Sequence, residues 1–160
     1  FNVSIPSGID HGERIRLTGK GEAGEQGGTP GDLFIEMVIQ EHPIFKREGQ
    51  NLYCDVPIGF ATAALGDTIE VPTLHGSVKL KIPSETQTNA LFRLRHKGMN
   101  ASDRHRAGDL MCNIIVETPV KLSKAQQKLL REFADSIESH DKHSPHAKDW
   151  LKSVQDFFSS

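Results

Sequence analysis

One segment of this chain occurs twice at a fixed spacing, and this repeat constrains the fold more than any other feature. Residues 5–33 match residues 82–110 at a constant offset of 77 positions, without a gap. The matching pairs are Ile5-Pro6-Ser7 with Ile82-Pro83-Ser84, Arg16-Leu17 with Arg93-Leu94, Lys20-Gly21 with Lys97-Gly98, and Gly31-Asp32-Leu33 with Gly108-Asp109-Leu110. A fixed period indicates two copies of one supersecondary unit. We therefore expect a tandem of two related modules.

The two copies differ in what precedes them. A strand-rich segment, Leu52 to Val78, comes before the second copy, whereas no counterpart precedes the first. The chain also begins at Phe1 and not at methionine. We therefore expect the first module to lack its N-terminal part.

Composition excludes several classes of protein. A hydrophobic content of 36 % and a charged content of 25 % are typical of a globular chain, and 160 residues suggest one or two domains. The net charge of −2 and the scattered basic residues do not indicate a nucleic-acid binder. No apolar run approaches the roughly 18 residues of a membrane helix. Cys54 and Cys112 lie in apolar, alternating runs, so we expect two small, buried hydrophobic side chains and a reducing, cytoplasmic setting; the alternatives are a disulfide or a catalytic thiol.

Alternating apolar and polar residues predict a series of short strands. The first module is expected to contain strands at 1–5, 14–17 and 33–39, followed by a polar hinge at 46–51. The second is expected to contain a short helix at 60–65, closed by Gly66, and strands at 52–58, 68–71, 78–82, 92–95 and 110–116.

After residue 122 the apolar period becomes helical. Ser123 and Gln126 form a capping-box pattern, and an apolar stripe follows at Leu129, Leu130, Phe133 and Ile137. Residues 140–146 are polar and predict a linker. Ser144-Pro145 then predicts the start of a second amphipathic helix, whose stripe is Trp150, Leu151, Val154, Phe157 and Phe158.

Three patterns resemble chemical sites but have simpler interpretations. Residues 19–24 satisfy G-x-G-x-x-G, yet the following Gly- and Pro-containing segment cannot form the helix that a dinucleotide site requires, so we expect a flexible loop. Pro145 interrupts the spacing of His140, His143 and His146, so we expect a solvated linker and no metal site. Asp32 and Asp109 recur in both copies, which favours a role in turns over catalysis. We therefore do not expect an enzyme.

Exposed apolar residues are the remaining candidates for function. Phe45 follows the last strand of the first module, between Pro43 and Lys46. It is either a contact for a partner or a plug between the modules. The C-terminal aromatic stripe has three readings: cover for the rest of the chain, a dimer contact, or a tethered mimic of a bound peptide.

The ordered set of motifs in this chain resembles the C-terminal half of the DnaJ family of co-chaperones, over residues 1 to about 137. The motifs are Val3-Ser4-Ile5-Pro6, Gly12-Glu13-Arg14-Ile15-Arg16-Leu17, Gly19-Lys20-Gly21-Glu22-Ala23-Gly24, Gly31-Asp32-Leu33, His42-Pro43-Ile44-Phe45-Lys46-Arg47-Glu48-Gly49, Asn51-Leu52, Ala64-Leu65-Gly66, Val71-Pro72-Thr73-Leu74-His75-Gly76, Lys97-Gly98-Met99, Gly108-Asp109-Leu110 and Glu117-Thr118-Pro119-Val120.

The resemblance implies a mainly β fold of two tandem, β-sandwich-like modules, the first of them truncated, followed by a dimerisation helix and a short amphipathic tail helix. The corresponding boundaries are 1–46 and 47–120 for the β-domains, 121–139 for the dimerisation helix and 140–160 for the linker and tail. The family also implies a J domain and a zinc-binding cysteine region, whose motifs this sequence does not contain, so zinc is expected only in a missing upstream part.

The resemblance further implies a function and its residues. The expected function is binding of unfolded or misfolded polypeptides and delivery of these clients to a DnaK-type chaperone by an intact homodimer. Client binding is assigned to Phe1 and Phe45, and dimerisation to Leu129, Leu130, Phe133 and Ile137. The alternative from a different class is a small-molecule or nucleotide-binding enzyme domain that uses the Gly-rich loop.

Overall fold

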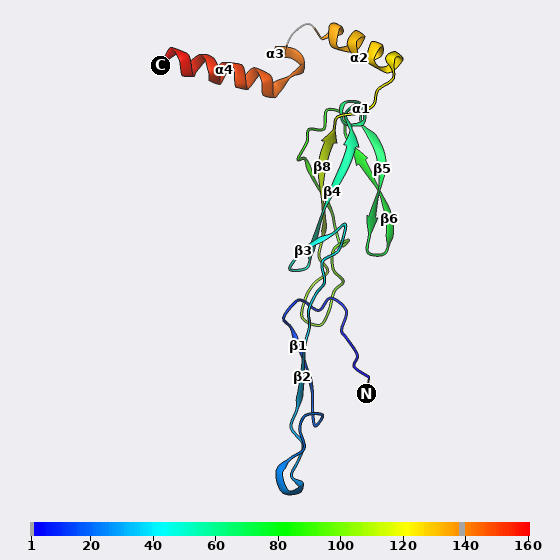
Figure 1. The fold of residues 1–160 in the computed structure, drawn as a ribbon, viewed down its shortest axis with the longest axis vertical. Coiled ribbons are helices and arrows are strands. Elements are labelled where there is room, and N and C mark those ends of the chain that lie inside the picture. Colours follow the sequence, from blue (N-terminus) through cyan, green and yellow to red (C-terminus); the bar gives the residue numbers. More distant parts are fainter. Residues whose placement is uncertain (1, 138–139) are drawn as a thin grey trace. The chain divides into compact units, whose positions relative to one another are not determined.

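The computed structural model describes residues 2–137 and 140–160, with the side chains of His140 and Asp141 left out. The chain forms two compact units, Phe1–Thr118 and Pro119–Ser160. The first unit is built from strands and the second from helices (Figure 1). The predicted fold class, a mainly β, sandwich-like chain followed by two C-terminal helices, is confirmed. The boundary between two modules at residues 46 and 47 stays a prediction.

A two-stranded antiparallel sheet represents the first repeat. Strand β1 (Arg14–Leu17) pairs with β2 (Leu33–Glu36), and a long loop joins them. This loop contains the short 3-10 helix η1 (Glu25–Gly27). Ile15, Leu17, Leu33 and Ile35 are half-buried, whereas their neighbours along both strands are exposed, as the alternating sequence predicts.

A four-stranded sheet forms the centre of the first unit, in the order β3-β4-β8-β7. Strand β4 (Asn51–Gly59) pairs in parallel with β8 (Leu110–Glu117), and this pair joins distant parts of the sequence. The edge strands β3 (Lys46–Glu48) and β7 (Leu91–Leu94) pair antiparallel with β4 and β8. The predicted strands of the second module are therefore confirmed.

A hairpin covers one face of this sheet (Figure 1). It consists of β5 (Asp67–Thr73) and β6 (Gly76–Ile82), and it follows the short helix α1 (Phe60–Leu65). Gly66 ends α1 as predicted, with φ of 80° and its N–H donating to the Thr62 carbonyl at 2.8 Å. The core between sheet and hairpin includes residues that are almost fully buried: Val71, Ile82, Leu110, Cys112 and Ile114.

The structure reproduces the repeat at the level of individual residue pairs. In the first copy Arg16 pairs with Phe34 and Leu17 with Leu33. In the second copy Arg93 pairs with Met111 and Leu94 with Leu110, the same positions 77 residues later. The two strand pairs therefore share one register, which supports the interpretation of the repeat as one unit used twice.

Asp32 and Asp109 hold the turns of the two copies. Asp32 accepts a hydrogen bond from the Gly19 N–H at 2.9 Å and pairs with Arg16. Asp109 accepts from the His96 N–H at 3.0 Å and lies 3.6 Å from Arg93. The hydrogen bond from the Gly19 N–H is the main cause that lowers the pKa of the Asp32 carboxyl, and the hydrogen bond from the Arg16 side chain is the second. The predicted role of these aspartates in turn structure is confirmed.

Three predictions for the first module are wrong in detail. Residues 2–5 form no strand, and Ile5 is 61 % exposed, because among the described residues no strand lies beside them to pair with. The third strand ends at Glu36 rather than at residue 39. The polar segment 46–51 is not a hinge: β3 and the start of β4 form a tight hairpin through Gly49, which has φ of 59°.

The second unit contains the helices α2 (Lys124–Ser136), α3 (His140–His143) and α4 (Pro145–Ser159). The predicted capping box is present, since the Gln126 N–H donates to Ser123 Oγ and the Ser123 N–H donates to Gln126 Oε1. The prediction of a linker at 140–146 is wrong, because α3 occupies most of it. Helix α3 ends just before Ser144. A residue that precedes a proline, as Ser144 precedes Pro145, disfavours helical backbone.

The remaining predictions from composition can also be compared with the structure. Cys54 and Cys112 are free and buried, at 5 % and 0 % exposure, as expected. None of the helices formed by the described residues combines the length and the apolar character needed to cross a bilayer.

Equivalent glycines of the two copies have different surroundings, and this difference predicts their tolerance to substitution. A Cβ on Gly108 would lie 1.7 Å from the Gln50 carbonyl oxygen, whereas one on Gly31 would meet no atom closer than 3.9 Å. We expect Gly108→Ala to lower the free energy of unfolding by roughly 3 kcal/mol. The matched variant Gly31→Ala should remain within about 0.5 kcal/mol of wild type. Urea denaturation measures both, and equal losses would contradict this account.

Candidate functional site

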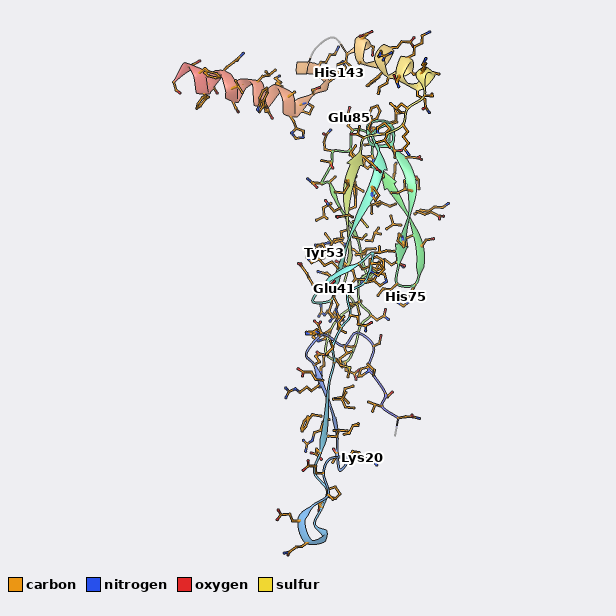
Figure 2. The ribbon with its side chains drawn as sticks, viewed as in Figure 1. Lys20, Glu41, Tyr53, His75, Glu85 and His143 are labelled. Atoms are coloured by element: carbon orange, nitrogen blue, oxygen red, sulfur yellow. The ribbon has the colours of Figure 1, made fainter. Side chains whose placement is uncertain are left out.

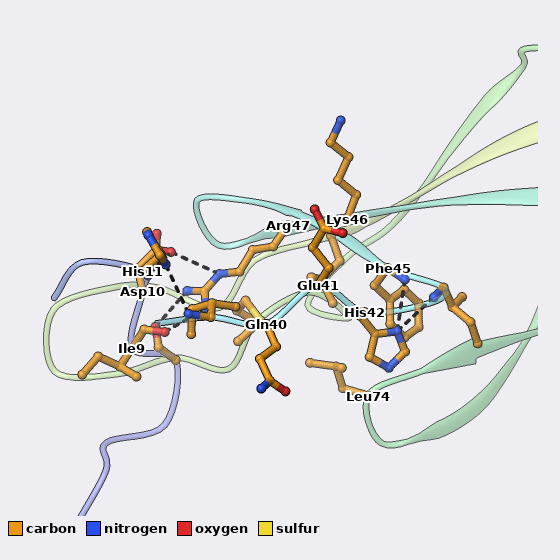
Figure 3. Close-up of a pocket in the computed structure, with 15 residues that line it drawn as sticks. Ile9, Asp10, His11, Gln40, Glu41, His42, Phe45, Lys46, Arg47 and Leu74 are labelled. Carbon is orange, nitrogen blue, oxygen red and sulfur yellow. Dashed lines mark hydrogen bonds and ion pairs between the residues drawn. The ribbon is translucent and has the colours of Figure 1, made fainter. Parts of the chain in front are cut away.

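A cavity of about 870 Å³ lies beside β3 and is the candidate site (Figure 3). Its wall is formed by residues 8–11, by most of residues 39–47, and by Leu52, Leu74 and Met99. These segments come from the first repeat, the connection between the copies, the hairpin β5–β6 and the second repeat. In Figure 2, Glu41 from the connection and His75 beside Leu74 lie in this region, well away from Lys20 in the loop between β1 and β2. The volume is within the range of about 300–1,000 Å³ typical of ligand pockets.

Arg47 holds one wall of the pocket in place. Its Nη1 and Nη2 donate to the carbonyl oxygens of Ile9 and Gly8 at 2.8 and 3.2 Å, and its Nε donates to the Gly49 carbonyl at 2.7 Å. Asp10 lies 3.6 Å from the same guanidinium. The Arg47 side chain is only 12 % exposed, so its charge serves this wall and is not available to a ligand.

Several contacts between the repeats fix the segment around Gly8. Gly8 has φ of 77°, and a Cβ there would lie 2.5 Å from the Asn100 carbonyl oxygen, so this position requires glycine. The Asn100 Nδ2 donates to Ser7 Oγ at 3.1 Å. His105 Nε2 lies 3.1 Å from Glu13 Oε1. The hydrogen bond from the Asp10 N–H is the main cause that lowers the pKa of the Glu13 carboxyl, and the hydrogen bond with the His105 side chain is the second. The pocket wall therefore depends on contacts between both copies.

Two histidines organise the connection that forms the opposite wall. The Nδ1 of His42 accepts hydrogen bonds from the N–H groups of Ile44 and Phe45 at 3.1 and 3.2 Å, and its ring lies 5.1 Å from that of Phe45. The Nδ1 of His11 accepts from the Ile39 N–H at 3.2 Å. In both rings Nδ1 is the acceptor, and the two rings satisfy backbone groups of a segment without regular secondary structure.

The floor and the rim of the pocket differ in exposure. Phe45 and Leu52, at 8 % and 4 % exposure, belong to the hydrophobic core and form the floor with the half-buried Met99. Ile44, Leu74 and Ile39 form the rim at 50 %, 40 % and 39 % exposure. Figure 3 shows Leu74 reaching toward His42 and Phe45 from the turn of the hairpin. Such an arrangement can accept an apolar side chain, whose full burial stabilises a complex by about 1.5–3 kcal/mol.

Phe45 takes part in the pocket in a different way from that expected. Its burial in the core contradicts its interpretation as an exposed apolar residue, whereas the choice between a client contact and a plug between modules stays open. The other predicted client residue, Phe1, lies outside the described residues. Sequence reasoning missed the rim residues and the wall at 8–11. Their only signal was the apolar Ile44 and Leu74, each next to turn residues.

The apolar stripe of α2 is exposed in the second unit. Leu129, Phe133 and Leu130 are 66 %, 48 % and 36 % exposed, and Ile137 is half-buried at the C-cap. Within α4, Trp150, Phe157 and Phe158 are also exposed, at 65 %, 73 % and 78 %. Both helices therefore present apolar faces that their own unit leaves in contact with solvent.

The Gly-rich pattern that suggested nucleotide binding has a structural role, whereas the His140 side chain, part of the pattern that suggested a metal site, lies outside the described residues. The Gly-rich loop is followed by η1 and β2 and by no α-helix, and glycines there allow close backbone approach: a Cβ on Gly21 would lie 2.6 Å from the Asp32 carbonyl oxygen. Among residues 2–137 and 140–160, no cluster of three or more histidine, cysteine or acidic side chains could hold a metal ion, apart from side chains that the structure does not describe.

The hydrogen bonds of His42 generate a prediction. His42→Ala leaves the Ile44 and Phe45 amides without their acceptor, so we expect both to exchange with solvent about tenfold faster and the protein to lose about 1 kcal/mol of stability. His42→Asn places an amide oxygen near the position of Nδ1 and should restore most of the protection. Amide hydrogen exchange by NMR measures this directly. Unchanged exchange in the alanine variant would mean that the ring does not hold this wall.

Comparison with protein-family models gives a match to one described as the DnaJ C terminal domain, over residues 1–119. The match covers well over half of the chain, and it includes both repeats and the whole pocket wall.

Proposed function

The chain belongs to the DnaJ C-terminal domain family, a non-enzymatic chaperone family, and on this premise we propose that it binds unfolded or misfolded polypeptides at the pocket beside β3. The observation that carries the proposal is the apolar pocket with a buried aromatic floor and an exposed aliphatic rim. Unfolded chains expose the apolar side chains that such a pocket accepts. Phe45 contributes as the floor, and Phe1 is proposed as a second client contact on family resemblance alone.

The edge of the central sheet supports the same proposal. Strand β3 is an edge strand in the order β3-β4-β8-β7, and it follows directly after Phe45. An edge strand offers backbone donors and acceptors to an extended peptide, while neighbouring pockets take its side chains. A client segment beside β3 would therefore gain main-chain hydrogen bonds that do not depend on its sequence, and the pocket would select for apolar residues.

Substitutions in the exposed rim test this proposal without disturbing the core. Ile44→Ser and Leu74→Ser should each weaken binding of a fluorescent, Leu- and Phe-containing unfolded peptide about fivefold, because each removes roughly 1 kcal/mol of apolar contact. Val38→Ser is the matched control, since Val38 is 73 % exposed and does not line the pocket. Fluorescence anisotropy gives the affinities. Binding that is equal in all three variants would remove the pocket from client recognition.

We also propose that α2 pairs two copies of the chain through Leu129, Leu130, Phe133 and Ile137. The support is the exposed apolar stripe of a well-capped helix. In a two-fold contact each residue acts twice, so a homodimer would hold two pockets on one client and raise its avidity. In the intact protein such a dimer would deliver clients to a DnaK-type chaperone in the cytoplasm, where thiols are reduced in the absence of oxidising stress.

A charge at the most exposed residue of the stripe tests the dimer. Leu129→Asp should convert a dimer to a monomer, because it would bury an unpaired carboxylate twice at a cost of several kcal/mol. Lys128→Asp, on the neighbouring position of the same helix, should leave the dimer intact. Sedimentation velocity at micromolar concentration distinguishes the two forms. A wild-type chain that sediments as a monomer at high micromolar concentration would contradict the assignment.

A further inference from the structure

The only two cysteines of the chain lie directly opposite each other on neighbouring strands. Cys54 of β4 and Cys112 of β8 are partners in the parallel register, although they are 58 positions apart in the sequence. Side chains of directly paired residues project from the same face of a sheet. Their sulfur atoms are 3.8 Å apart, which is within contact distance. The fold therefore brings the two thiols into hydrogen-bond contact without a disulfide between them.

The surroundings of the pair are apolar. Both thiols lie in the core between the sheet and the hairpin β5–β6, at 5 % and 0 % exposure. On the same strands, Leu52 and Ile58 flank Cys54, and Leu110 and Ile114 flank Cys112. This environment excludes charged or bulky reagents, so an oxidant would have to be small and neutral and would reach the thiols only through local opening of the sheet. Any reaction of one thiol therefore has the other thiol as its nearest reactive partner.

The contact makes the two thiols chemically unequal. In the structure the Cys54 thiol donates to Cys112 Sγ at 3.8 Å. When Cys54 loses its proton, Cys112 can donate in return, and this hydrogen bond lowers the pKa of Cys54. The hydrogen bond with Cys54, together with burial, raises the pKa of Cys112. Cys54 therefore loses its proton first and becomes the nucleophilic thiolate, while Cys112 keeps its proton. One cysteine is therefore suited to attack an oxidant and the other to resolve the product.

We propose that Cys54 and Cys112 form an intramolecular oxidation site, at which a hydroperoxide converts the two thiols into a disulfide between β4 and β8. This site is separate from the client pocket and does not rest on the proposed function. It would cross-link the central parallel pair of the sheet under oxidising stress and leave it open under reducing conditions.

The reaction balances in two steps. The Cys54 thiolate attacks the peroxide, an S–O bond forms as the O–O bond breaks, and hydroxide leaves, so sulfur is oxidised and peroxide reduced. Cys112 then attacks the Cys54 sulfenic acid, the S–S bond forms as the S–O bond breaks, and the thiol proton leaves with the hydroxyl as water. The sulfurs must approach from 3.8 Å to about 2.05 Å, while neighbouring strands already lie at a Cα spacing that disulfides accept.

The disulfide would have a measurable effect on unfolding. It would close a loop that contains the whole second copy of the repeat, so the unfolded chain would lose more freedom than the folded one. We expect the oxidised protein to unfold at a clearly higher urea concentration than the reduced protein. Dithiothreitol should reverse the shift, because a disulfide is reduced by an excess of thiol.

The test is mass spectrometry of the purified, reduced chain after treatment with hydrogen peroxide. After catalase has removed the peroxide, the protein is unfolded in guanidinium with N-ethylmaleimide, and its intact mass is measured. We expect a monomer about 2 Da lighter than the reduced chain that carries no maleimide, and two maleimides after reduction. The single variants Cys54→Ala and Cys112→Ala are controls, because neither can lose 2 Da within one chain.

Three results would overturn the proposal. The first is a wild-type protein that keeps two alkylatable thiols, and the second is one that gains oxygen on both sulfurs without forming the bond. The third is a disulfide that forms only when urea has unfolded the chain, or that lowers the urea midpoint. Either form of the third result would mean that the native sheet does not accommodate the bond.

Discussion

The parallel pairing of β4 with β8 connects the parts of the first unit that the chain itself keeps apart. Its register runs from Leu52 and Leu110 to Gly59 and Glu117. Strand β3 is attached to β4 alone and β7 to β8 alone, so without this pair the four-stranded sheet would separate into two hairpins. The same pair supplies most of the surface on which β5 and β6 pack. The floor of the pocket also depends on it, because Leu52 lies at the start of β4.

The pocket shows how a structural charge can support an apolar site. Arg47 comes from the edge strand β3, but its hydrogen bonds all go to backbone carbonyl groups, those of Gly8, Ile9 and Gly49. Without the guanidinium, the carbonyl groups of a segment without secondary structure would need water as their hydrogen-bond donor. By replacing that water, the guanidinium lets an irregular segment serve as a wall beside apolar residues. His42 and His11 do the same for amide groups of the facing segment.

Local patterns in the sequence predicted local structure well. The strands at 14–17 and 52–58, the cap at Gly66 and the box at Ser123 all depend on neighbours a few positions away, and all are present. Alternation alone misled at residues 2–5, since a strand also needs a partner. Polar composition concealed β3, because edge strands carry charged side chains.

The candidate site was much harder to predict from the sequence. Its wall joins residues 8–11 to Leu74 and Met99, and no local pattern links positions so far apart. The burial of Phe45 likewise depends on β4 and on the hairpin β5–β6, which follow it in the chain. The repeat was informative for a different reason: two copies with matching aspartates, glycines and register could be compared with each other.

The separation between β4 and β8 has a consequence for the order in which the molecule assembles. The pairs β3–β4 and β5–β6 close short loops and β1–β2 closes a longer one, whereas β4 must wait for a strand more than fifty positions further along the chain. Contacts between distant residues form late, because the entropy of closing the loop must be lost before they stabilise the fold. A chain emerging from the ribosome can thus form its hairpins early. Its pocket, with Leu52 on the floor and Met99 in the wall, is completed only after β8 has been synthesised.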